Sequence, residues 1–227
     1  MAAIEVRNLS FTYPTGERKA LEDVSFDVDS SEFVVVCGKS GCGKSTLLRQ
    51  LKKNLVPYGE KKGGAYYEGI DITELEDRVN ASEIGFVQQN PDNQIVTDKV
   101  WHDLAFGLES LGLDNASIKR RVAEMASFFD IQTWFRKDVS ELSGGQKQLL
   151  NLASIMVMQP KVLILDEPTS QLDPIAASEF LKVIYRINRE LGTTVIISEH
   201  RLEELFTMAD RVMVMDSGKI LTMDTPW

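Results

Sequence analysis

Cysteine is scarce in this 227-residue chain, and long apolar runs and an excess of positive charge are missing from it. Its two cysteines, Cys37 and Cys42, lie close together around a glycine-rich segment, which argues against a disulfide framework and for a reducing compartment. The longest apolar runs, such as FVVVCG and VLIL, have the length of a strand and not of a membrane span. A net charge of −9 disfavours direct binding to nucleic acid or to anionic lipid.

The composition that remains is that of a globular domain. Hydrophobic residues make up 43% of the chain and charged residues 26%, and the length is sufficient for a full core. Apolar strand patterns alternate with helical patterns, which predicts an α/β fold around a mostly parallel sheet covered on both faces.

Hydrophobic periodicity places the expected elements. Alternating residues at 4–9 and 24–28 and a return hairpin at 63–72 predict an antiparallel β subdomain in the N-terminal part. Strands are expected at 33–37, 84–88, 162–166, 194–198 and 211–216, and helices at 44–53, at 176–191 and directly after His200. The pattern from 98 to 139 is helical, so we expect one domain over 1–227, with a core at 1–97 and 140–227 and an inserted helical subdomain at 98–139.

A phosphate-binding loop follows the strand at 33–37. Residues 38–45 read GKSGCGKS and match G-x-x-x-x-G-K-[ST], with the strand before and the helix after that this motif requires. Consecutive N–H groups of such a loop converge on an anion. Lys44 is expected to reach the β- and γ-phosphates of ATP, and Ser45 to bind Mg²⁺. The nucleotide-binding residues of this loop are Gly38, Lys39, Ser40, Gly41, Cys42, Gly43, Lys44, Ser45 and Thr46.

Two acidic residues end the apolar strand at 162–166. A carboxylate at the carboxyl end of a buried parallel strand points at the ligand crevice of such folds. Asp166 suits Mg²⁺, and Glu167 suits a general base that polarises an attacking water. The plainer alternative is that both acids cap the strand–loop junction, and the intact phosphate loop favours the catalytic interpretation.

A second helix start with the features of an anion site lies in SELSGGQKQLLN at 140–151. A serine and two glycines precede an unbroken run of helix-forming residues, which presents N–H groups and a hydroxyl to an anion. One domain therefore carries two phosphate-binding segments about a hundred residues apart.

The phosphate loop, SGGQ and LILDEPTSQLDP together resemble the ATP-binding cassette (ABC) superfamily, a P-loop NTPase family, from Ile4 to about Asp224. LSGGQ, at 142–146, is the signature motif of that family. The resemblance implies that two domains pack head to tail, as a homodimer or a heterodimer, and bury two ATP molecules. Its signature residues would then bind the partner's ATP: Ser143, Gly144, Gly145 and Gln146.

Four further residues match positions of the same family. Tyr13 matches the aromatic that stacks on adenine, and Asp173 the acidic member of a loop that crosses between subunits. Gln89 matches the glutamine that touches Mg²⁺ or the attacking water, although Gln88 is adjacent and only the following Asn-Pro favours Gln89. His200 matches the histidine that hydrogen-bonds the γ-phosphate.

A narrower similarity connects QNPDNQIVTDKVWHDLAFGLESLGL to cobalt-type and energy-coupling-factor (ECF) importer ATPases. It implies a peripheral ATPase at the cytoplasmic face of the cell membrane that powers import of a vitamin or metal ion. Its partners would be a second ATPase domain, a transmembrane coupling subunit and a membrane substrate-binding subunit, with no nucleic acid. The alternatives are another ABC importer or exporter, a non-transport ABC ATPase, and a nucleotide-binding regulator without turnover.

The sequence departs from the family pattern in three places. Leu149, Leu150 and Asn151 follow LSGGQKQ, where an arginine and small apolar residues are usual. His200 lies in SEHRLEE, a form that often marks one half of a tandem double ATPase. The sequence ends at LTMDTPW, where relatives continue, so we expect the first half of a longer protein.

Overall fold

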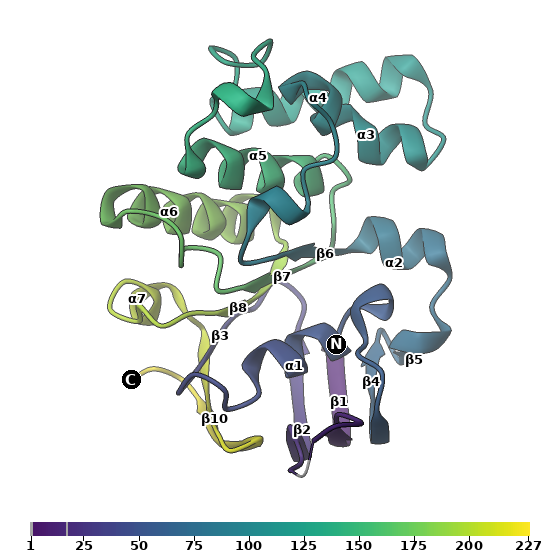
Figure 1. Ribbon diagram of the computed structural model, residues 1–227, viewed down its shortest axis with the longest axis vertical. Helices are drawn as coiled ribbons and strands as arrows, with labels where there is room; N and C mark the ends of the chain where they lie inside the picture. The colour runs from purple at the N-terminus through teal and green to yellow at the C-terminus, as the bar shows by residue number, and fades with distance from the viewer. Residues whose placement is uncertain (1, 17) are drawn as a thin grey trace.

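A computed structural model describes residues 2–16 and 18–227 (Figure 1). The first half contains β1 (Ala2–Thr12), β2 (Leu21–Asp29), β3 (Phe33–Gly38), α1 (Lys44–Gln50), β4 (Glu60–Tyr67), β5 (Ile70–Asp71), α2 (Asp77–Glu83), β6 (Ile84–Val87) and α3 (Val100–Ser110). The second half contains α4 (Asn115–Phe128), α5 (Gly144–Met156), β7 (Val162–Asp166), α6 (Pro174–Leu191), β8 (Thr194–Ser198), α7 (Leu205–Met208), β9 (Arg211–Asp216) and β10 (Lys219–Asp224).

These strands form two sheets. The larger has the order β10-β9-β3-β8-β7-β6 and is parallel except for the edge strand β10. The smaller, β2-β1-β4-β5, is antiparallel. The predicted mostly parallel core and antiparallel β subdomain are therefore confirmed.

Both faces of the larger sheet are buried, as period-2 side-chain alternation shows along β3. Phe33, Val35 and Cys37 point to one hydrophobic cluster, and Val34 and Val36 to the other. The first cluster is completed by α3 to α6. The second contains α1 and the antiparallel sheet, so α1 lies between the two sheets (Figure 1). This sandwich fixes the strand ends that carry the candidate site.

The helical pattern at 98–139 corresponds to α3 and α4, which lie together with α5 at the top of Figure 1. Leu104 of α3, Val122 of α4 and Leu150 of α5 are buried in the same cluster. The signature helix α5 is therefore packed on helices that precede it in sequence. The limits of the inserted subdomain remain a prediction.

Three local differences separate the expected elements from the observed ones. The helix expected directly after His200 begins only at Leu205, and residues 201–204 form no helix. The helix α2 and the edge strand β10 were not predicted, because one is short and the other is largely exposed. Within the described residues, no helix is long and apolar enough to cross a bilayer.

The central strand β7 offers a test of the packing. Ile164→Ala is expected to lower the free energy of unfolding by about 2–5 kcal/mol, because the fully buried side chain leaves a cavity between β7 and its neighbours. Denaturant unfolding measures this loss. Leu221→Ala on β10, where the side chain is 64% exposed, should change the same quantity by no more than about 0.5 kcal/mol. Equal effects would contradict the described core.

Candidate active site

The candidate site lies where parallel strands end at one edge of the larger sheet. β3 runs into the phosphate loop at Gly38, β7 ends at Asp166, and β8 ends at Ser198. Asp166 and Ser198 are register partners, so their side chains begin side by side. Sheet geometry alone therefore brings three distant parts of the sequence together.

Glycine is required at two positions of the phosphate loop. Gly38 and Gly43 have φ angles of 147° and 111°. A Cβ on Gly38 would lie 2.2 Å from the Met215 carbonyl oxygen, and one on Gly43 would lie 2.6 Å from that of Ala20. The loop is thus pressed against β9 and the segment before β2, and only glycine fits.

Lys44 is held inside this loop with 3% of its surface exposed. Its Nζ donates hydrogen bonds to the carbonyl oxygens of Gly38 at 2.9 Å and Lys39 at 3.4 Å. Glu167 Oε1 lies 3.6 Å from the same Nζ. The ammonium group is therefore positioned at the centre of the loop with its positive charge facing an acid.

One carboxylate oxygen joins the strand ends. Asp166 Oδ1 accepts hydrogen bonds from Ser45 Oγ and from Ser198 Oγ, each at 2.9 Å. The main-chain N–H of Glu167 donates to Ser198 Oγ at 3.0 Å. Since Asp166 is 7% exposed and accepts from two hydroxyls, it fixes the start of α1 relative to β7 and β8.

Glu167 is held in an unusual backbone conformation. Its φ of 47° lies in the left-handed region, which non-glycine residues rarely adopt and which clusters at functional sites. This conformation directs its carboxylate toward Lys44 and His200, whose Nε2 lies 2.9 Å from Glu167 Oε1. An acid between a lysine and a histidine at the mouth of a phosphate loop is suited to orienting and deprotonating a water.

Lys44, Ser45 and Glu167 line a cavity of about 430 Å³, whereas Asp166, Ser198 and His200 do not line it. The other lining residues are Ala20 and those that were predicted to contact nucleotide or the attacking water: Tyr13, Ser40, Gly41, Gly43, Thr46 and Gln89. The Tyr13 hydroxyl is 3.1 Å from Thr46 Oγ1, and its ring packs edge-on against Phe11. Gln89 lines the cavity and Gln88 does not, which separates the two candidates that the sequence left open.

The signature residues lie elsewhere. Ser143 caps α5, its Oγ accepting from Gln146 N at 3.2 Å while the Gln146 side chain accepts from Ser143 N at 3.0 Å. Ser143 and Gly144 are exposed. Asp173 likewise caps α6, accepting from the N–H groups of Ile175 and Ala176. In the described part of the chain, none of residues 142–146 lines the cavity that contains Lys44.

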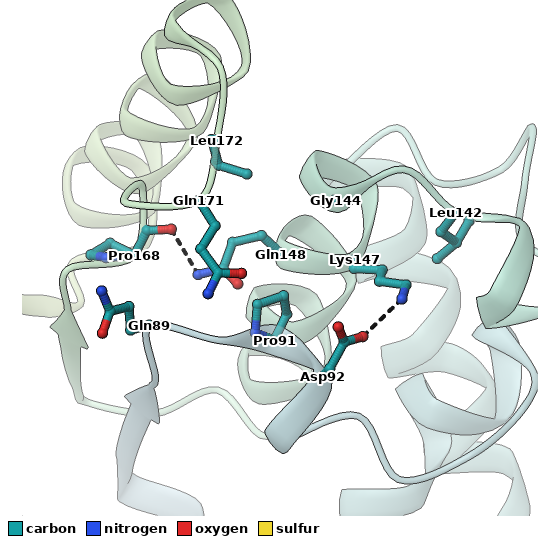
Figure 2. A pocket seen from close by; sticks show the side chains of 10 residues that line it. All are labelled: Gln89, Pro91, Asp92, Leu142, Gly144, Lys147, Gln148, Pro168, Gln171 and Leu172. Carbon is teal, nitrogen blue, oxygen red and sulfur yellow. Dashed lines mark hydrogen bonds and ion pairs between the residues drawn. The ribbon is translucent and has the colours of Figure 1, made fainter.

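A smaller pocket separates the signature helix from the cavity. It has a volume of about 120 Å³ and lies between the segment at 89–92, the start of α5 and the loop after β7 (Figure 2). Gln89 lines both this pocket and the larger cavity, and Gln148 and Gln171 face the pocket from α5 and from the loop before α6. Gln89 is thus shared by the cavity at the phosphate loop and the pocket at the start of the signature helix.

Two residues that organise the site were missed in the sequence. Ser198 donates a hydrogen bond from its hydroxyl to Asp166. Its position at the end of a predicted buried strand could have indicated this role. Glu199 is 2% exposed, and its carboxylate accepts from Thr169 N, Thr169 Oγ1 and His200 N. It links the loop after Glu167 to the main chain of His200, and no local pattern reveals that role.

The two cysteines have no evident part in the chemistry. Both are free and buried. Burial raises the pKa of the Cys37 thiol, and the neighbouring Cys42 raises it further. A thiol that stays protonated at neutral pH is a poor nucleophile and a poor metal ligand.

Comparison with protein families gives two matches. A model described as "ABC transporter" matches residues 21–170. A model described as "AAA domain, putative AbiEii toxin, Type IV TA system" matches residues 137–204. The first covers well over half of the chain and includes the phosphate loop, the signature motif and Glu167.

Individual proteins show the same similarity. A putative ABC transporter ATP-binding protein of Bacillus cereus is 50% identical over the whole chain, which spans 41% of that relative's length. The energy-coupling factor transporter ATP-binding protein EcfA2 of Caldanaerobacter subterraneus is 40% identical, over 98% of this chain and 79% of its own. The structure of CbiO1 from Clostridium perfringens, described as part of the ABC transporter complex CbiONQ, superposes with a TM-score of 0.89 at 31% identity, covering 99% of this chain and 89% of that one.

The buried lysine allows a matched test of the phosphate loop. Lys44→Met is expected to weaken Mg-ATP binding by about tenfold to a hundredfold, because a charge-assisted hydrogen bond to phosphate is lost. Lys39→Met removes an exposed side chain but keeps the loop's main-chain N–H, so its affinity should stay close to wild type. Nucleotide titration measures both. Unchanged affinity in Lys44→Met would refute the assignment of the loop.

Proposed function

The chain belongs to the ABC transporter family, and on that premise we propose that it binds and hydrolyses ATP to power a membrane importer of the energy-coupling-factor type. The observation that carries this proposal is the contact of Glu167 at the cavity with both Lys44 and His200, with Glu167 Oε1 3.6 Å from Lys44 Nζ and 2.9 Å from His200 Nε2. Positioning and charge neutralisation are what phosphoryl transfer to water requires from a protein.

Each residue has one part in the proposed reaction. The main-chain N–H groups of the loop and Lys44 hold the β- and γ-phosphates, and Tyr13 stacks on adenine. Glu167 accepts a proton from the attacking water, and Gln89, which lines the same cavity, orients that water. His200 holds the Glu167 carboxylate and donates to the γ-phosphate. The left-handed backbone of Glu167 keeps the carboxylate at this place.

The residues also fit Mg²⁺. Ser45 Oγ and Asp166 Oδ1 lie 2.9 Å apart and are both oxygen donors, as this ion prefers, and Gln89 lines the same cavity. Within the described residues, no group of three or more His, Cys, Asp or Glu forms a protein-only metal cage, which suits an ion that shares phosphate oxygens. When bound, Mg²⁺ neutralises the charge on the β- and γ-phosphates.

The signature residues serve a second nucleotide in this proposal. Ser143, Gly144 and Gly145 are separated from the chain's own cavity, so their anion site requires ATP held by another domain. Mutual donation between two such domains makes an interface in which each ATP is contacted from both sides. Loss of the γ-phosphate removes one of these contacts and lets the dimer open.

Transport of the ECF type is supported by the relatives. EcfA2 is an energy-coupling factor transporter protein by name, and CbiO1 is part of a transporter complex. We propose the same partners here: a second ATPase domain, a transmembrane coupling subunit and a membrane substrate-binding subunit that takes up a vitamin or metal ion at the cytoplasmic membrane. An apolar groove of about 520 Å³ between α3 and α4, lined by Trp101, Val122 and Phe135 among others, fits a helix of the coupling subunit.

Glu167→Gln tests the catalytic assignment. Turnover is expected to fall by about a hundredfold to ten-thousandfold, since a general base is lost while the shape and Mg-ATP binding are kept. Steady-state phosphate release measures turnover. Light scattering on size exclusion should show that the variant dimerises only with Mg-ATP. Normal turnover would place the base elsewhere, and a persistent ATP-bound monomer would mean that residues 143–146 require a different partner domain.

Ser143→Arg tests the assignment of the signature residues to another domain's ATP. The bulky side chain should block closure on a second nucleotide, so turnover is expected to fall at least as far as in Glu167→Gln. ATP binding by the monomer should remain within about twofold of wild type, because Ser143 does not line the chain's own cavity. Loss of monomer binding in a nucleotide titration would refute the trans assignment.

A further inference from the structure

The main chain of Gln88 is held from both sides by side-chain amides. Its N–H donates to Gln94 Oε1 at 2.6 Å, and its carbonyl oxygen accepts from Gln148 Nε2 at 3.4 Å. Because the peptide unit is planar, fixing both polar groups of residue 88 also fixes where the next residue begins. The next residue is Gln89, the side chain shared by the two pockets.

Gln94 is in turn bonded to the signature helix. Its Oε1 also accepts from Asn151 Nδ2 at 2.9 Å, and its Nε2 donates to the Phe86 carbonyl oxygen of β6 at 2.9 Å. Asn151 is 4% exposed and Gln94 is half-buried, so this contact is partly shielded from water. The amide of Gln94 therefore ties β6, the main chain before Gln89 and α5 into one unit.

Gln148 extends the same connection to the other catalytic loop. Its Nε2 donates at 2.9 Å to the carbonyl oxygen of Pro168, the residue directly after Glu167 (Figure 2). The same Nε2 also donates to the Gln88 carbonyl oxygen. Because both acceptors are carbonyl oxygens, the NH2 group of the Gln148 amide must face them, and this fixes the orientation of the amide. Its own oxygen is buried and finds no partner among the described residues, a cost that proteins rarely carry without a gain elsewhere.

Leu149 occupies the position where the family pattern has an arginine, and its neighbours Gln148 and Asn151 make these links from α5. The bonds from Gln148 and Asn151 lie three positions apart on α5 and so on one face of the helix. A third link, the ion pair of Lys147 with Asp92 at 2.8 Å, joins the same two segments (Figure 2). That pair is partly exposed and touches neither the main chain of Gln88 nor Gln94, so it contributes little.

We propose that Gln94, Gln148 and Asn151 are positioning residues. Through them, the place of the Gln89 side chain at one ATP site depends on the position of the signature helix α5, whose first residues contact the ATP of the other site. The proposal rests on the function proposed above, since α5 begins at the residues assigned to a second ATP. A shift of α5 on closure moves Asn151 and Gln148 with it. Gln89 then follows through Gln94 and through the Gln88 carbonyl, and occupancy of one site changes the reaction rate at the other.

Kinetics of Gln94→Met and Asn151→Leu test the proposal. Both substitutions keep side-chain size and remove the polar link. Asn151→Leu, which loses one neutral hydrogen bond, is expected to lower kcat about fivefold to tenfold, and Gln94→Met, which loses that bond and two others, by at least as much. KM and monomer ATP affinity should change less than twofold in both variants. The double variant should be no slower than the slower single variant, because both changes break the same bond. Lys147→Met is the matched control and should keep wild-type kcat.

Other outcomes overturn the proposal. An unchanged kcat in Gln94→Met, in protein with a normal thermal midpoint, would show that the link does not set Gln89. Equal losses in kcat and in monomer affinity, or additive losses in the double variant, would indicate a general structural defect. Should Asn151→Leu fail to fold, Gln94→Met carries the test, because Gln94 is only half-buried.

Hydrogen exchange separates this proposal from the proposed ATPase function. The Gln88 N–H should exchange at least tenfold faster in Gln94→Met than in wild type, and faster in Asn151→Leu as well, whether or not the chain hydrolyses ATP. If the wild-type protein shows no turnover but the two variants show this faster exchange, the ATPase function is refuted and the positioning of Gln88 through Gln94 stands. If the Gln88 N–H exchanges at the wild-type rate in both variants, only the positioning through Gln94 is refuted.

Discussion

The double hydrogen bond on Asp166 Oδ1 is the interaction on which the site depends. Ser45 and Ser198 donate to one oxygen from two different segments, so three chain regions that are far apart in sequence share one point. The proposed catalytic residues are neighbours of these three residues in sequence: Lys44 precedes Ser45, Glu167 follows Asp166, and His200 lies two residues after Ser198. The hydrogen bonds on Asp166 therefore hold them near one another. If this oxygen moved, the acid, the lysine and the histidine would separate.

The parallel sheet explains why so much of this arrangement could be predicted. Strands that are buried on both faces give continuous apolar runs, and the carboxyl ends of such strands must meet at one edge. The motif at 38–45 and the acids after β7 therefore specified a common site before any geometry was known. The position of the signature residues outside the cavity could be predicted only from the family resemblance. The distance between two loops in a folded protein produces no pattern in the local sequence of either loop.

The remaining features could not be predicted for a physical reason. Glu199, Gln94 and Asn151 act through hydrogen bonds to residues about 30 or more positions away, or to main-chain groups, and such bonds place no periodic constraint on the chain. The late start of α7 was not predicted either. The pattern RLEELF suits a helix, whereas residues 201–204 form none and α7 begins at Leu205. Local preference is a weak guide to where a short helix begins.

The capping box at the start of α5 restricts which residues can occupy position 143. Aspartate or asparagine would cap the helix as well as serine does, since each offers an oxygen to the Gln146 N–H. A hydroxyl oxygen that accepts one hydrogen bond still has its own proton to donate, whereas a carboxylate has none and would repel a phosphate. If Ser143 contacts a second nucleotide as proposed, natural variation at this position should be narrower than helix stability alone allows, and aspartate should persist only in copies that have lost that contact.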